Sequence, residues 1–208
     1  MLIVLDLFTF DTIISPINPI LPKDGEVTYI NRFLDTTTSA WYFQKLIETI
    51  DWRQDELFMF GKLIQTKRKV AWYGDAPFTY TYSHKLKTAS LWTPDLIELK
   101  NSVAQKTGVN YNSCLLNLYH SGGEGMGWHS DDEPELEANG SIASLSLGAA
   151  RVFDFKHKTT NERVRILLDD GSLLEMKGCT QSYWMHQLPK ALKIKEARIN
   201  LTFRNIVR

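Results

Sequence analysis

The sequence predicts an α+β fold in which helices come early and a double-sheet barrel or jelly roll follows. Two helical stretches lie before residue 109. After that residue the pattern changes to short alternating or apolar runs, which Gly, Asp and Asn residues separate as turns. The expected strands are SCLLNLY, IASLSLG, ARVFDFKH, RVRILLD, GSLLEMK and ARINLTFR.

The two helices are predicted from apolar spacing and from residues that begin and end helices. The first covers about 39–50, with one buried face formed by Trp41, Leu46, Ile47 and Ile50. The second opens at Thr93-Pro94, a hydroxyl cap followed by proline at the first helical position. It ends near Gly108.

The chain as a whole is predicted to be one domain, 1–208, because it has no internal repeat and no break in composition. Its formal net charge is zero, so any affinity for nucleic acid must come from a local patch. The apolar N-terminal stretch lacks a basic region and contains Asp6 and Asp11, which argues against a signal peptide. We expect no membrane span, and reduced thiols at Cys114 and Cys179 indicate a cytosolic protein.

A candidate metal site lies in the stretch NLYHSGGEGMGWHSDDEPEL, residues 117–136. His129 and Asp131 would share one face of a strand and could bind one ion. A third ligand could be His186, in SYWMHQLP, or its rival His120 beside the glycines. Two imidazoles and one carboxylate suit non-heme Fe(II). The alternative is a chance H-x-D pair and a hydrogen-bonded core histidine at 186.

The other two histidines, His84 and His157, lie in polar segments that contain lysine, and we expect them in solvated loops. They are therefore not candidates for the third ligand.

The last expected strand has two unlike faces. Ile199, Leu201 and Phe203 alternate with Arg198, Asn200, Thr202 and Arg204. On an edge strand the polar face would simply be wet. Inside a barrel it would line a cavity with guanidinium groups suited to carboxylates, such as those of a small dicarboxylate that chelates Fe(II). Asn117 and Tyr119, also two apart, could add hydrogen bonds to that ligand.

These motifs together resemble the AlkB family of Fe(II)- and 2-oxoglutarate-dependent dioxygenases. The matching features, in order, are Asn117-x-Tyr119, Gly122, Gly127, H-x-D-D-E at 129–133, IASLSLG, RVFDFKHK, GSLLEM, His186 and R-x-N-L-T-F-R. The resemblance extends over about 57–206. It implies a double-stranded β-helix (jelly-roll) core at about 111–208, preceded at about 1–110 by helices and a nucleotide-recognition hairpin or lid.

The resemblance also implies ligands. His129, Asp131 and His186 would bind iron, and 2-oxoglutarate would be held by Asn117, Tyr119, Arg198, Thr202 and Arg204. With O₂ as oxidant, the implied activity is oxidative demethylation of bases such as N1-methyladenine and N3-methylcytosine in DNA, releasing formaldehyde and succinate. Alternatives are an RNA demethylase, a protein hydroxylase, or a non-enzymatic nucleic-acid-binding jelly roll.

Residues 57–87 combine aromatic and basic side chains, which suits stacking on bases and contact with phosphates. A hairpin with a solvated basic edge and a buried aromatic face is the alternative. By resemblance the substrate contacts are Phe60, Gly61, Lys62, Arg68, Tyr80, Tyr82 and Asp132. Phe60 would enter the gap left by a flipped base, and Lys67-Arg68 replaces a Pro-Arg pair common in relatives. We expect a monomer, cytoplasmic or, in a eukaryote, nuclear.

Overall fold

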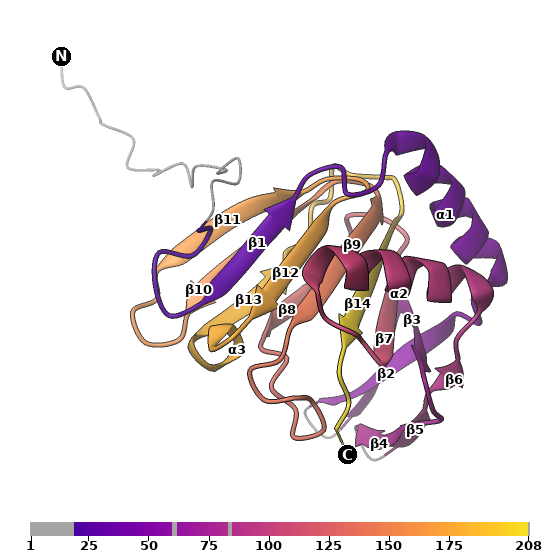
Figure 1. Ribbon diagram of the computed structural model, residues 1–208, viewed down its shortest axis with the longest axis horizontal. Helices are drawn as coiled ribbons and strands as arrows, with labels where there is room; N and C mark the ends of the chain where they lie inside the picture. Colours follow the sequence, from indigo (N-terminus) through magenta and orange to yellow (C-terminus); the bar gives the residue numbers. More distant parts are fainter. Residues whose placement is uncertain (1–18, 60–61, 83–84, 208) are drawn as a thin grey trace.

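A large sheet joins the first half of the chain to the second. The computed structural model describes residues 19–59, 62–82 and 85–207, with only the backbone described for 55–59, 62–64, 80–82 and 85–87. Within these ranges the large sheet has the strand order β1-β12-β9-β14-β7-β3-β2, with β6 beside β3 (Figure 1). Its strands are β1 (Glu26–Ile30), β2 (Arg53–Met59), β3 (Lys62–Gly74), β6 (Ser90–Leu91), β7 (Ser113–Tyr119), β9 (Ile142–Gly148), β12 (Leu173–Lys177) and β14 (Arg198–Arg204).

A smaller sheet of four strands has the order β11-β10-β13-β8. Its strands are β8 (Met126–His129), β10 (Arg151–His157), β11 (Arg163–Leu168) and β13 (Trp184–Leu188). A separate hairpin pairs β4 (Thr79–Tyr82) with β5 (Lys85–Thr88). Both sheets and the hairpin are antiparallel except where β6 runs parallel to β3. This arrangement confirms the jelly-roll prediction and all six expected strands.

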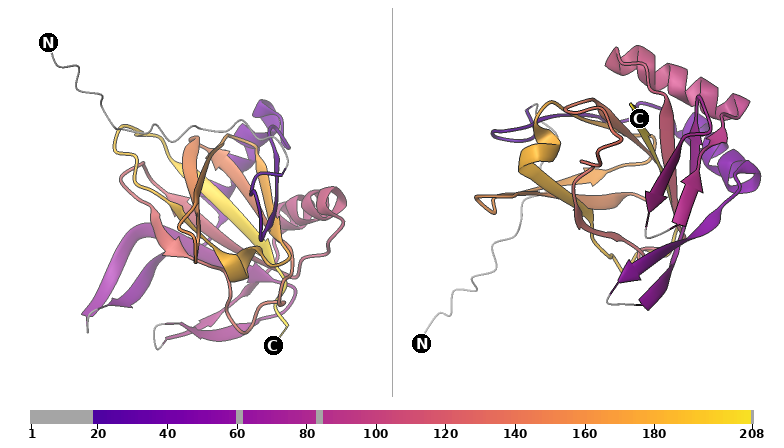
Figure 2. Two further views of the ribbon diagram at one scale, coloured as in Figure 1. Left: turned by 90° about the vertical axis from the view of Figure 1, so that its left-hand side faces the viewer. Right: turned by 90° about the horizontal axis from the view of Figure 1, so that it is seen from below.

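The structure adds strands to the first half that the sequence pattern placed only loosely. β1 pairs with β12 at one edge of the large sheet, and β3 pairs with β7 toward the other edge. β2 and β3 form a long hairpin that extends beyond the body of the molecule (Figure 2). The core sheet therefore contains strands from both sides of residue 110.

Three helices complete the fold: α1 (Thr36–Thr49), α2 (Pro94–Thr107) and the short α3 (Thr180–Tyr183). Helix α2 begins and ends as predicted, because the Thr93 side chain accepts a hydrogen bond from a backbone N–H and Gly108 adopts φ 75°. Helix α1 begins three residues earlier than predicted, since Asp35 rather than a later residue caps it. No described helix is long and apolar enough to cross a membrane.

The prediction that Trp41 belongs to the buried face of α1 is wrong. Its side chain is 51% exposed, whereas Ser39 and Leu46 are fully buried and Ile50 nearly so. Trp41 lies five residues before Leu46, about 140° around the helix, so it cannot share the face that meets the sheet. The prediction assigns Trp41 to the buried face because it is apolar, although its position around the helix does not match that face.

Two hydrophobic cores lie on the two faces of the large sheet. On one face, α1 and α2 pack against apolar residues of β7, β9 and β14, including Ile199, Leu201 and Phe203 (Figure 2). On the other face, part of the space between the two sheets is filled by residues such as Phe155 and Trp184. The rest of that space is a cavity, and the polar face of β14 lines it.

His157 is not in a solvated loop, contrary to the prediction. It is the last residue of β10 and is 3% exposed. Its Nε2 lies 3.3 Å from Asp24 Oδ2, and its Nδ1 accepts from two backbone N–H groups in the following turn. The alternation of β10 holds to its last residue, so His157 faces inward with Phe155 despite its polar neighbours. His84 lies outside the described residues.

Candidate active site

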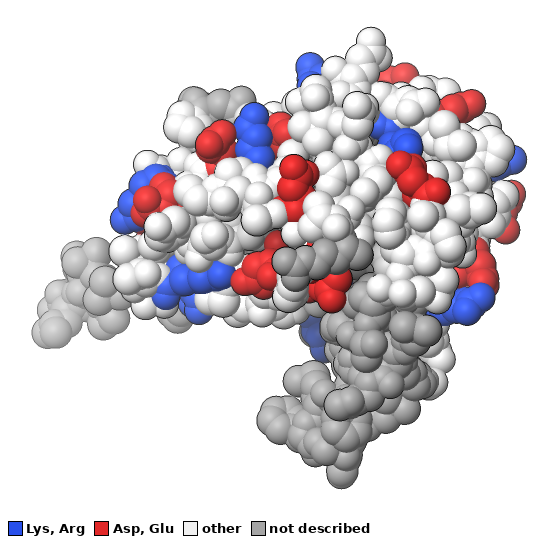
Figure 3. Space-filling model, turned by 60° about the horizontal axis from the view of Figure 1, so that its bottom comes forward, with Lys and Arg blue, Asp and Glu red and all other residues white. Residues whose placement is uncertain are grey.

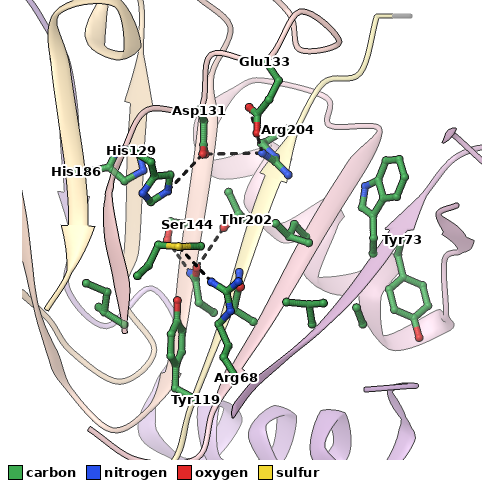
Figure 4. Close-up of a pocket in the computed structure, with 18 of the residues that line it drawn as sticks. Arg68, Tyr73, Tyr119, His129, Asp131, Glu133, Ser144, His186, Thr202 and Arg204 are labelled. Carbon is green, nitrogen blue, oxygen red and sulfur yellow. Dashed lines mark hydrogen bonds and ion pairs between the residues drawn. The ribbon is translucent and has the colours of Figure 1, made fainter. Parts of the chain in front are cut away.

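A cavity of about 920 Å³ lies between the two sheets, and it brings together most of the predicted site residues that the structure describes (Figure 4). Strands β7 and β14 of the large sheet supply one wall, and β8 and β13 of the small sheet supply the other. Histidines gather on the small sheet and arginines on the large one. One wall of the cavity therefore offers metal ligands, and the other offers cationic groups.

The three predicted metal ligands meet on the small-sheet side. One ligand atom from each of His129, Asp131 and His186 lies within 4.8 Å of the others. His129 and His186 are Cα partners on adjacent strands, and Asp131 follows β8 by two residues. His120, the rival, is outside this group: its side chain is 45% exposed and its Nδ1 contacts Glu124 at 3.1 Å. The structure thus places His186, and not His120, beside His129 and Asp131.

Local contacts orient the histidines before any ion binds. His129 Nδ1 lies 2.8 Å from the carbonyl of Gly127, and that bond leaves Nε2 facing Asp131 Oδ1 at 3.7 Å. His186 is almost fully buried, with the Phe153 ring stacked on it at 5.3 Å. Burial lowers the pKa of His186 to about 4, partly offset by Asp131. The imidazole is neutral at pH 7, as a metal ligand must be.

Asp131 is held as a carboxylate. Burial by itself would raise its pKa, but Arg204 and the two histidines outweigh that effect, and the pKa is lowered. Arg204 Nη1 lies 3.9 Å from Asp131 Oδ2 and 4.0 Å from Glu133 Oε2. The backbone N–H of Asp131 donates to Gln181 Oε1 at 2.9 Å. Two imidazoles and one carboxylate on one side of a cavity can hold a divalent ion while leaving positions open.

The far end of the cavity is cationic and buried. Arg198 is 2% exposed, and its Nη2 donates to Ser146 Oγ at 2.9 Å. Burial lowers the pKa of Arg198 to about 10, and no carboxylate among the described residues forms an ion pair with it. Its Nε, together with Asn117 Oδ1 and Arg204 Nε, is buried without a hydrogen-bond partner in the described structure. The two guanidinium N–H groups suit a bound anion, whose oxygens accept hydrogen bonds.

Strand register explains why these groups share one wall. In the β7–β14 ladder Tyr119 is the Cα partner of Arg198, and Asn117 is the partner of Asn200. Alternate residues of both strands therefore point into the cavity, as predicted for Asn117, Tyr119, Arg198, Thr202 and Arg204. β7 and β14 are far apart in the sequence, but they pair directly and so bring these residues together.

Asn200 is a cavity residue that the predicted ligand set omitted. Its Nδ2 donates to Ser144 Oγ at 2.7 Å, and its Oδ1 accepts from Thr202 at 3.1 Å. The alternation that selected Arg198 and Thr202 also places Asn200 between them, so the sequence did contain the information. An amide was given less weight than its charged neighbours.

The predicted substrate residues are only partly described. Phe60 and Gly61 lie outside the described residues, and for Lys62, Tyr80 and Tyr82 only the strand positions are described. Arg68 is buried in the cavity wall, and its Nη1 lies 3.3 Å from Met126 Sδ. At the rim, Asp132 is mostly exposed and pairs with Lys158 at 3.5 Å. On the described part of the face in Figure 3, basic and acidic side chains are interspersed.

Comparisons with known proteins agree with this geometry. A sequence profile of the 2OG-Fe(II) oxygenase superfamily matches residues 26–204, from the start of β1 to the end of β14. Alpha-ketoglutarate-dependent dioxygenase alkB homolog 3 of Homo sapiens is 39% identical over 183 residues, which cover 84% of this chain and 64% of that protein. DNA oxidative demethylase ALKBH2 of Mus musculus is 42% identical over 157 residues, 72% of this chain and 66% of that protein.

The chain thus spans slightly less than two thirds of these relatives. A solved structure described as "The structure of OsALKBH1" is similar in fold, with a TM-score of 0.58 and 16% identity. That likeness covers 86% of this chain and 97% of the other.

Proposed function

The chain belongs to the AlkB family within the 2OG-Fe(II) oxygenase superfamily, and we propose that it removes alkyl groups from the ring nitrogens of bases in DNA. One observation carries the proposal. A single cavity has a two-histidine, one-carboxylate group on one wall and a buried arginine without a carboxylate partner in the described residues at its far end. A metal ion would bind to the first group, and a dicarboxylate that chelates this ion would reach the arginine with its other carboxylate.

Fe(II) would be held by His129, Asp131 and His186. The chemistry of these donors fits the ion, since two neutral nitrogens and one carboxylate oxygen leave coordination positions for other ligands. Arg204 keeps the carboxylate ionised, and the Gly127 carbonyl fixes which nitrogen of His129 faces the site. The protein contributes orientation and charge state here.

The co-substrate 2-oxoglutarate would lie along the wall formed by β7 and β14. Arg198 would bind its distal carboxylate through the donors that the Ser146 hydroxyl leaves free. Asn117, Tyr119, Thr202 and Arg204 would contact the remaining polar atoms. Asn200, linked to Ser144 and Thr202, would hold that wall in register.

When bound, Fe(II) and 2-oxoglutarate would allow O₂ to hydroxylate an N-methyl carbon: one oxygen atom oxidises 2-oxoglutarate to succinate and carbon dioxide, and the other forms a hydroxymethyl group that leaves the base as formaldehyde. Arg198 at the far end and His186 at the metal site are both nearly fully buried, which limits the access of water to the two groups. Phe153 covers one face of His186 and so restricts the ring's orientation. Asp132, next in sequence to a ligand and exposed at the rim, would meet the target base.

DNA is the proposed substrate because of the similarity to a protein named DNA oxidative demethylase. N1-methyladenine and N3-methylcytosine are the proposed lesions, and a chain acting as a monomer is the simplest form. The hairpins β2–β3 and β4–β5 bear the residues proposed to flip and stack the base. An RNA demethylase would use the same cavity and is an outcome of the test below.

The test measures formaldehyde released from oligonucleotides containing N1-methyladenine or N3-methylcytosine. We expect release only when Fe(II), 2-oxoglutarate and O₂ are all present, and loss of release in His186→Ala but not in His120→Ala. Matched single-stranded, duplex and RNA oligomers rank the substrates. Turnover without 2-oxoglutarate, or turnover on RNA alone, would contradict the proposal.

A further inference from the structure

Arg151 is a buried arginine outside the cavity lining, and the proposed mechanism does not use it. It begins β10 and is 1% exposed. Its Nη2 donates to the carbonyls of Glu124 and Pro189, each at 2.8 Å, and its Nη1 donates to the carbonyl of Ser121 at 3.5 Å. One guanidinium thus binds three backbone carbonyls from two separate segments. A charge this deeply buried is costly unless it has such partners.

The two segments are the turn 120–125 and the segment 189–194. The turn connects β7, which bears Asn117 and Tyr119, to β8, which bears His129. The second segment follows β13, which bears His186. The backbone groups of Gly122 also bond to Ala191 and Ile194 across the same contact. Arg151 therefore fastens the wall proposed for 2-oxoglutarate to both strands proposed for iron.

The same guanidinium also contacts Tyr119. Its carbon lies 5.9 Å from the centroid of the Tyr119 ring, and that of Arg198 lies 5.7 Å from the same ring. The phenol is therefore held by two cations, each within the range of a cation–π contact. Burial and the charge of Arg151 both lower the pKa of Arg198. An incoming carboxylate at this end would relieve that repulsion.

We propose that Arg151 is a positioning residue that sets the length of dicarboxylate the cavity accepts, by fixing Tyr119 and the turn 120–125 relative to Arg198. This inference rests on the proposed function. If Tyr119 were released, the far end of the cavity would gain freedom, and a 2-oxo dicarboxylate longer by one methylene would be accommodated. The two acids compared below differ by that methylene alone.

The experiment measures binding without turnover. Protein loaded with Mn(II) is titrated by calorimetry with 2-oxoglutarate and with 2-oxoadipate. The variants are Arg151→Met, which removes all the contacts, and Arg151→Lys, which keeps a charge beside Tyr119. Arg165→Met is the control, because Arg165 lies on the neighbouring strand β11, binds Asp154 of β10 and does not line the cavity.

In Arg151→Met we expect the dissociation constant for 2-oxoglutarate to rise about tenfold or more, in the range found when an orienting partner is lost. The constant for 2-oxoadipate should change less than the constant for 2-oxoglutarate, so the ratio of the two constants moves toward one. Arg151→Lys should lie between the wild type and Arg151→Met. The affinity of Arg151→Met for Mn(II) in the absence of co-substrate should match that of the wild type. The ratio of the two dissociation constants in Arg165→Met should also match the wild type.

An unchanged preference in Arg151→Met, or a fall in affinity for both acids in parallel, would overturn the proposal. If Arg151→Met does not fold, Arg151→Lys decides, since a wild-type preference in that variant also overturns it. A wild-type protein that fails to bind 2-oxoglutarate would instead overturn the proposed function, and this inference with it.

Discussion

His129 and His186 are direct Cα partners in the ladder between β8 and β13, and their ring centroids lie 4.3 Å apart. Fifty-seven residues separate them along the chain, so only this strand pairing brings them together. A shift of one residue would turn His186 to the opposite face and place Met185 or Gln187 beside His129. The metal site therefore depends on the register of the small sheet.

Replacement of His186 by alanine should abolish metal binding. The remaining pair, His129 and Asp131, offers only two ligands. Loss of a residue that hydrogen-bonds to a metal ligand typically lowers metal affinity by about 10- to 100-fold, and we expect the Mn(II) affinity of His186→Ala to fall by more than that. Calorimetric titration with Mn(II) measures this. His120→Ala is the control, because that side chain contacts Glu124 and not the site. Retained affinity in His186→Ala with a loss in His120→Ala would contradict the assignment.

Replacement of Arg198 by methionine should remove most of the affinity for 2-oxoglutarate. A hydrogen bond to a charged group contributes about 1.5–3 kcal/mol, so loss of the guanidinium should weaken binding at least about tenfold. Ser146→Ala keeps the charge but removes the hydroxyl that orients it, and we expect a loss of about fivefold. Equal affinities in the wild type and Arg198→Met would place the co-substrate elsewhere.

Gly122→Ala should destabilise the protein through steric overlap. A Cβ at residue 122 would collide with the carbonyl of Ala191, whereas a Cβ at Gly127 would meet nothing within 4 Å. We expect the free energy of unfolding to fall by about 2 kcal/mol or more for Gly122→Ala, since backbone is displaced. Gly127→Ala, in the following strand β8, should change it by no more than about 0.5 kcal/mol. Urea denaturation of both variants checks the difference.

Metal and co-substrate together should raise the melting temperature. Ligand at about one hundred times its dissociation constant adds about 2.7 kcal/mol of stability. For a domain of this size, that corresponds to roughly 5–10 °C. Thermal unfolding with Mn(II) and 2-oxoglutarate, and again after a chelator is added, measures the shift and its reversal. The same shift in His186→Ala would show that the ligands bind outside the proposed site.

Local sequence determined a large part of this protein. The Thr93-Pro94 cap and Gly108 define α2, and strict alternation in ARINLTFR separates the core face of β14 from its cavity face. These features depend on near neighbours, because backbone geometry fixes which residues share a face. The H-x-D pair and the arginines could therefore be assigned to a site before any tertiary contact was known.

Tertiary structure decided what spacing along the chain cannot. His186 lies at the metal site, whereas His157 is buried against Asp24. The pairing of the strands decides both positions. Trp41 is apolar yet exposed, because the angle of α1 against the sheet selects other positions. Arg151 is unremarkable in sequence and gains its role from carbonyls about 30 residues before it and 38 residues after it. Periodicity specifies the face a side chain occupies, and only long-range packing specifies what that face meets.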